Sequence, residues 1–106
     1  ADLTGAPLSD AELSNSDFSG SDLTDAYFRD ADLSKSNILS ANLSGANLSG
    51  ADLSKTSLSD ANLSNAVLFD ADLSDAILFD ADLAGAKLSS ADLTDVGLAD
   101  VTPVGS

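Results

Sequence analysis

Large apolar side chains recur at every fifth position of this chain, from Leu3 and Leu8 through to Leu98. The residue two places before each of them is small, and it is alanine in most repeats. We call the large apolar position i and the small position i−2. The other three positions carry mainly Asp, Asn, Ser, Gly and Lys, which are typical of turns and solvated surfaces. The pattern predicts two inward and three outward residues in each repeat.

The period of five excludes the two regular secondary structures. Five residues of an α-helix advance by roughly 500°, so the apolar stripe would drift around a helix by roughly 140° per repeat. In a strand, positions i and i+5 would point to opposite faces. The chain must therefore turn a corner once in every repeat.

The run from Ala41 to Ser54, ANLSGANLSGADLS, resembles the pentapeptide-repeat proteins, whose pattern is A(D/N)LXX. The resemblance covers residues 1–100, or twenty consecutive repeats, and 101–106 form a C-terminal tail or partial cap. It implies an all-β fold, a right-handed quadrilateral β-helix with four pentapeptides in each square coil and the i and i−2 side chains inside. Twenty repeats then make about five coils in one domain.

The charge of the chain limits its partners. Eighteen acidic residues against four basic ones give a formal net charge of −14. Direct binding to nucleic acid or to an anionic membrane is not expected, because phosphate contacts need Lys and Arg. No apolar run reaches the 18 or more residues of a membrane span. We expect a protein partner, and a basic one fits best. The alternative is that the acidity serves only solubility.

Assigning successive repeats to four walls in rotation separates acidic walls from mixed ones. At i−1, walls one and three carry acidic or amide ladders, the acidic members being Asp2, Asp22 and Asp82 on wall one and Glu12, Asp32, Asp52, Asp72 and Asp92 on wall three. We expect Lys35 and Lys55 to pair with Asp32 and Asp52. A straight row of carboxylates does not converge as a calcium site requires, so no metal site is predicted.

The outward apolar residues lie on the other two walls. They are Tyr27, Val67 and Phe69 on wall two, and Leu39, Ile77 and Phe79 on wall four. One interpretation is a protein-binding surface on either wall. The other is that β-branched and aromatic side chains simply favour a strand-like ladder.

The sequence offers little for catalysis. It has no His and no Cys, no glycine-rich phosphate loop, and no break in the repeat that would build a cleft. We therefore expect no enzyme and no cofactor, and interpret the chain as a non-enzymatic scaffold or protein-interaction module. The alternative comes from the resemblance: some pentapeptide-repeat proteins mimic DNA and bind or protect DNA gyrase, although those relatives resemble longer rods with a C-terminal dimerisation module. Ice binding by Thr4, Thr24, Ser44 and Ser64 is disfavoured by Ala84 and the flanking acids.

The ends of a β-solenoid expose unpaired strands. Pro7 lacks an N–H for further stacking, and Val96, Val101, Pro103 and Val104 suggest a modest apolar plug. The hypothesis is that the chain either was cut from a longer protein or pairs end to end with another copy through a terminal coil.

Overall fold

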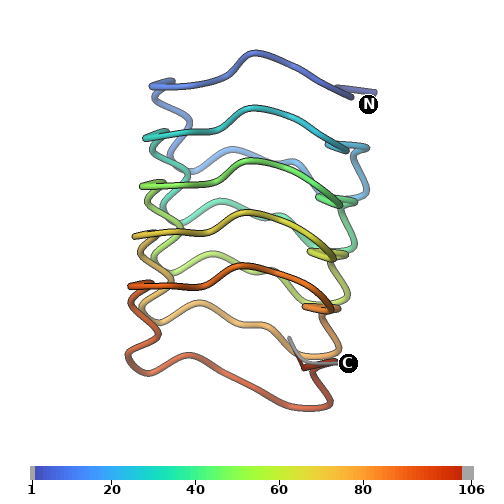
Figure 1. Ribbon diagram of the computed structural model, residues 1–106, viewed down its shortest axis with the longest axis vertical. Helices are drawn as coiled ribbons and strands as arrows, with labels where there is room; N and C mark the ends of the chain where they lie inside the picture. The colour runs from blue at the N-terminus through green and yellow to red at the C-terminus, as the bar shows by residue number, and fades with distance from the viewer. Residues whose placement is uncertain (1, 104–106) are drawn as a thin grey trace.

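The computed structural model describes residues 2–103, which form a stack of square coils with the two termini at opposite ends (Figure 1). These residues contain no helix and no strand longer than a single bridging residue. Instead, seventeen parallel bridges join residues twenty positions apart, from Asp2↔Asp22 to Asp82↔Thr102. One coil is therefore four pentapeptides. The stack measures 29 × 22 × 22 Å.

Each pentapeptide is a short extended segment followed by a turn. The N–H at i−2 of the next repeat donates to the carbonyl at i, as from Ala26 to Leu23 at 3.1 Å. The residue at i+2 has a positive φ in every repeat from Gly5 to Asp100. Together these features define a type II turn, in which Gly and Asn are favoured at the third position. The Gly, Asp and Asn residues at i+2 thus mark the corners of the square.

In the inner coils, three backbone N–H groups of each repeat hold neighbouring coils together. In the second coil, Tyr27 donates to Ala6 of the preceding coil at 2.9 Å, while Phe28 and Asp30 donate to the following coil at 2.7 and 2.9 Å. Because the N–H at i−2 closes the turn, only the N–H at i+1 is left without a backbone acceptor.

The side chain at i−1 supplies this missing acceptor in twelve repeats, as in the 2.9 Å bond from the Ser64 N–H to Asn62 Oδ1. The acceptor is always Asp or Asn, whose short side chains readily bond the backbone two residues on. This contact explains why Asp and Asn recur before the large apolar residue.

The interior is a column of leucine and alanine side chains. From Leu23 to Leu78 the residues at i are at most 1% exposed, and the alanines at i−2 pack between them. Two of the inward hydroxyl groups are hydrogen-bonded to the turns: Ser36 Oγ donates to the Leu13 carbonyl at 3.0 Å, and Thr56 Oγ1 donates to the Leu53 carbonyl at 2.7 Å. Two inward positions therefore accept a polar residue without leaving its hydroxyl unpaired.

Candidate functional site

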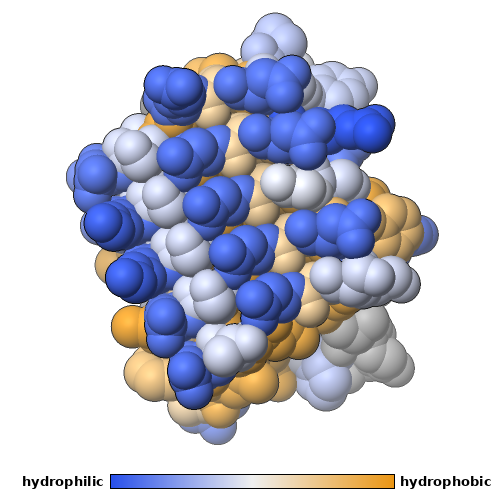
Figure 2. Space-filling model, turned by 90° about the vertical axis from the view of Figure 1, so that its left-hand side faces the viewer, coloured by the Kyte–Doolittle hydropathy of each residue, from blue (hydrophilic) through white to orange (hydrophobic). Residues whose placement is uncertain are grey.

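The acidic residues at i−1 stand in register along walls one and three. On wall three, bridges connect Glu12, Asp32, Asp52, Asp72 and Asp92 in sequence. On wall one, Asp2 and Asp22 are adjacent, and Asn42 and Asn62 separate them from Asp82. Figure 2 shows one side of the stack, where hydrophilic residues form rows that run obliquely from one end toward the other.

Hydrogen bonds favour the ionised form of several of these carboxylates. Asp22 accepts from the Thr24 hydroxyl at 2.6 Å and from its N–H at 3.1 Å, and both bonds favour the charged form. The pKa of Asp22 is therefore below the ordinary aspartate value. The Thr24 hydroxyl bond is the larger cause, and the Thr24 backbone bond is the second. The same lowering of the pKa, with the same order of causes, occurs at Asp2, Asp32 and Asp92, and also at Asp17 on wall four. These groups are suited to presenting negative charge rather than to general acid catalysis at neutral pH.

The predicted ion pairs of Lys35 and Lys55 with aspartates on wall three are wrong. Among residues 2–103 the one ion pair joins Arg29 Nε to Asp30 Oδ2 at 3.8 Å, between two exposed side chains. Asp32 and Asp52 instead turn one carboxylate oxygen toward the N–H and hydroxyl of the serine two residues later. Lys35 and Lys55 lie beyond those serines at the corner. In the same described range, no group of three or more acidic residues converges as a metal site would require.

The apolar residues on walls two and four are exposed. Tyr27, Leu39, Phe69, Ile77 and Phe79 each have between 40% and 54% of their surface accessible, and Val67 is half-buried. On wall two, Asn47 separates Tyr27 from Val67. The fourth coil brings two apolar side chains together on each wall: Val67 with Phe69, and Ile77 with Phe79.

Those two repeats also lack the side-chain acceptor at i−1. Within residues 2–103 the N–H groups of Phe69 and Phe79 donate to no protein atom, because Val67 and Ile77 replace Asp or Asn. This feature was missed by the sequence reasoning. Its signal is visible, however, because the two repeats with phenylalanine at i+1 both have a β-branched residue at i−1.

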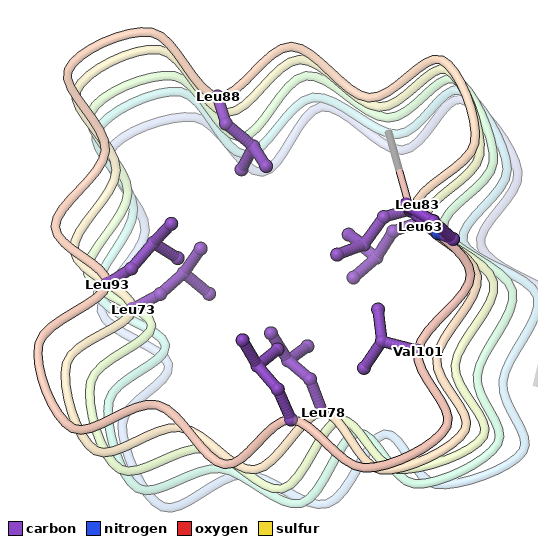
Figure 3. A pocket seen from close by; sticks show the side chains of 9 residues that line it. Leu63, Leu73, Leu78, Leu83, Leu88, Leu93 and Val101 are labelled. Atoms are coloured by element: carbon purple, nitrogen blue, oxygen red, sulfur yellow. The ribbon is translucent and has the colours of Figure 1, made fainter. Parts of the chain in front are cut away.

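The C-terminal end of the interior is open. A cavity of about 320 Å³ is lined only by apolar side chains, and leucines from all four walls point into it (Figure 3). Hydrophobic residues also gather at this lower end in Figure 2. Val101 and Pro103 line the cavity without closing it, and Leu98 is 58% exposed. The predicted plug is therefore incomplete over the described residues, and Val104 lies outside them.

The protein-family model described as pentapeptide repeats (8 copies) matches residues 1–38, 41–78 and 56–95 of the chain. The chain belongs to the pentapeptide-repeat family, and its fold is the right-handed quadrilateral β-helix that the sequence resemblance implies. Proteins of this family are generally non-enzymatic structural or interaction proteins. A search of curated proteins found no match. No helix in the described part of the chain is long and apolar enough to cross a membrane.

Solved structures give the same assignment. A pentapeptide repeat protein from the Arabidopsis thaliana thylakoid lumen is 37% identical, with a TM-score of 0.91 over 93% of this chain and 69% of that one. Rfr23 from the cyanobacterium Cyanothece 51142 is 35% identical, with a TM-score of 0.80 over 81% of this chain and 58% of its own. QnrB1, a plasmid-mediated fluoroquinolone resistance protein, is 22% identical with a TM-score of 0.50 over 95% and 64%, a similarity of fold alone.

Proposed function

We propose that this chain is a non-enzymatic scaffold that binds other proteins through its apolar walls. The observation that carries the proposal is the pair of modified repeats on the fourth coil, Val67 with Phe69 and Ile77 with Phe79. Each repeat exposes a phenylalanine where serine is usual and gives up the hydrogen bond to the N–H at i+1. Both features favour binding: a partner can bury the apolar area that is still exposed to water and can accept the hydrogen bond that the N–H at i+1 does not make within the protein.

The position of the two pairs suits a bridging role. They lie on opposite walls of one coil, and a rigid stack of inter-coil hydrogen bonds fixes the spacing between them. Each pair offers a small apolar surface among polar residues, as expected for the centre of an interface with a polar rim. A partner bound at one wall would leave the other wall accessible.

The test compares the wild-type chain with the Phe69→Ser, Phe79→Ser and double variants. Partners recovered from the source organism are purified, and their affinities are measured by calorimetry. Loss of one aromatic anchor should weaken a partner that uses its wall by about 1 to 3 kcal/mol. Ser49→Ala, on wall two of the third coil, is the control for a neutral surface change. Unchanged affinity of every partner for the double variant would reject these walls.

A second candidate function is mimicry of DNA, by which the chain would bind an enzyme such as DNA gyrase. The negative charge per unit length of the stack favours this function. Every charged side chain lies within residues 2–103, and fourteen net negative charges along 29 Å amount to about one per 2.1 Å. B-DNA carries about one per 1.7 Å of its axis. Hydrogen-bonded carboxylates on walls one and three support the same idea, because they hold their charge in fixed rows.

Gyrase supercoiling measured against increasing protein concentration, at low and physiological salt, tests this candidate. Mimicry predicts inhibition that weakens as salt screens the charges. The control changes Asp32, Asp52, Asp72 and Asp92 to Asn, which removes four charges and keeps the acceptors for the i+1 N–H groups. No inhibition at any concentration would exclude gyrase as the target, and equal inhibition by the control would exclude the wall-three ladder as its cause.

A further inference from the structure

We propose that wall four binds a basic, apolar polypeptide segment of another protein, seated on Ile77 and Phe79. This inference rests on the proposed protein-binding function and specifies both the wall and the chemistry of the partner.

Ile77 and Phe79 form the apolar centre of the site. They are 42% and 44% exposed, and they flank the buried Leu78 within one extended segment. Ile77 is bridged to Gly97 in the last coil, and a Cβ atom on Gly97 would lie 3.2 Å from the Phe79 ring. The missing side chain at Gly97 therefore gives the ring room to extend toward the next coil, which widens the apolar surface.

A backbone donor lies between the two apolar side chains. In an ordinary repeat the N–H at i+1 bonds to Asp or Asn at i−1, as Ser64 does to Asn62. Ile77 has no oxygen to offer, and the Phe79 N–H has no acceptor within residues 2–103. A backbone carbonyl of a bound segment can accept this hydrogen bond. Such a donor fixes the position of a polypeptide that the apolar contacts alone would leave free to slide.

The rim of the site is acidic on both corners. Asp75 and Asp95 occupy consecutive coils at the corner before Ile77, and Asp60, Asp80 and Asp100 occupy consecutive coils at the corner after Phe79. The nearest basic residue of these corner columns, Lys55, lies one coil before Asp75. The rim therefore complements lysine and arginine side chains on the partner and would repel a second copy that presents the same rim.

Wall two is less suited to the same partner. Val67 bridges directly to Lys87, and Arg29 lies two residues after Tyr27 on the same wall. Lys87 thus lies on wall two itself, directly beside Val67, whereas Lys35 and Lys55 lie in the corner column before wall four, in earlier coils than Asp75. A basic segment would meet like charge there, so the charge pattern selects wall four.

The experiment uses a phage-displayed library of random twelve-residue peptides, selected on the intact chain. Enriched sequences should combine Lys or Arg with aromatic or branched aliphatic residues. Affinities of the synthetic peptides are then measured by fluorescence polarisation. The variant Ile77→Asn/Phe79→Ser should bind them at least about tenfold more weakly. The matched wall-two variant, Val67→Asn/Phe69→Ser, should keep the wild-type affinity within about twofold.

Stability provides a control for the variants. The new asparagine in Ile77→Asn restores an acceptor for the N–H at position 79, so the denaturation midpoint should stay level or rise while peptide binding is lost. A fall in the midpoint would mean that the two apolar residues serve the fold, and it would overturn the inference. The wall-two variant restores its own acceptor in the same way.

The remaining outcomes separate this inference from the function on which it rests. Peptides that depend on wall two, or that lack basic residues, would overturn the choice of wall or of partner and leave the scaffold function standing. A failure to enrich any sequence, or binding that neither variant weakens, would overturn both. Dimerisation of the wild-type chain that Ile77→Asn/Phe79→Ser abolishes would assign the site to a second copy and overturn the basic partner.

Discussion

Phe18 and Phe28 meet edge to face inside the first two coils, with ring centroids 6.3 Å apart and ring planes at 75°. Phe18 extends from wall four and Phe28 from wall two, so the rings meet from opposite sides of the interior. The C-terminal end has no aromatic counterpart, and its leucines leave a cavity of about 320 Å³. The same backbone repeat thus carries an aromatic contact near one end of the interior and an open apolar cavity at the other.

The second coil and the last coil should differ in their tolerance of side-chain truncation. Phe28 is fully buried, and Phe28→Ala should lower the free energy of unfolding by about 3 to 5 kcal/mol. Leu98 is 58% exposed, and Leu98→Ala should cost less than about 1 kcal/mol because most of the side chain already contacts water. Urea unfolding followed by circular dichroism measures both values. Equal costs would show that the C-terminal coil is packed as tightly as the second.

The side-chain acceptor at i−1 gives a second prediction. Asn62→Ala removes the 2.9 Å bond to the Ser64 N–H and should lower the free energy of unfolding by about 0.5 to 1.5 kcal/mol. Ser64→Ala keeps that bond and loses only a 3.3 Å contact with Ser44 Oγ, so it should be close to neutral. The pair is compared by urea unfolding. An Asn62→Ala chain as stable as wild type would mean that water replaces the lost acceptor at no cost.

The corner in each repeat and the inward positions were predictable from spacing, whereas the square coil of four repeats came from the resemblance to the pentapeptide-repeat family. The period of five gives the corners, and the alternation of Leu with Ala gives a narrow interior. The Phe18–Phe28 contact could not be predicted in the same way, because it depends on how far each ring reaches across the interior. The lysine pairing failed for a local reason: the sequence shows that Lys35 is near Asp32, but not that Ser34 already binds its carboxylate.

The exposed apolar residues were located by the same rotation through four walls, and the structure places them on the surface. Their use as an interface stays a prediction. What the sequence reasoning lacked was the backbone donor beside them. Asn62 and Ile77 occupy equivalent positions in the repeat, but only the geometry of the turn shows that one binds an N–H and the other leaves it open.

Corner glycines offer a matched comparison of strain and crowding. Gly20 and Gly45 have φ angles of 68° and 70°, but only Gly45 lies against the Asp25 carboxylate of the preceding coil. Gly20→Ala should cost about 1 to 2 kcal/mol for the left-handed conformation. Gly45→Ala should cost more, since Asp25 must also move, and adding Asp25→Ala should remove that excess. If Gly45→Ala costs no more than Gly20→Ala, the carboxylate rotates away freely.

The hydroxyl bond to Asp32 gives a pH-dependent prediction. The Ser34 hydroxyl and N–H lower the Asp32 pKa, so Ser34→Ala should raise that pKa toward the ordinary value, as measured by NMR of the carboxyl carbon. Because the folded pKa is lowered, the associated stability is present above about pH 4 and is lost as the pH falls through the folded pKa. The stability difference between wild type and Ser34→Ala should shrink on acidification. Ser49→Ala, beside the non-titrating Asn47, should show no such pH dependence.

The two prolines of the chain lie where a further coil would need a donor. In later coils the N–H at i−1 donates to the preceding coil, as Tyr27 does to Ala6, but Pro7 in the first coil has no N–H. The N–H at i donates to the following coil, as Leu83 does to Thr102 at 3.0 Å, and Pro103 occupies this position beside the open cavity. Each proline thus removes one ladder bond that would join copies head to tail in register.

Pro7→Ala/Pro103→Leu restores both donors and should promote head-to-tail association. Light scattering over a range of concentrations is the measurement, carried out at high salt because the net charge of −14 opposes contact between copies. We expect the apparent mass of the variant to rise with concentration more steeply than that of wild type. The control Ser9→Ala changes the first coil without adding a donor and should behave as wild type. If the double variant and wild type associate equally at high salt, the prolines are not what limits stacking.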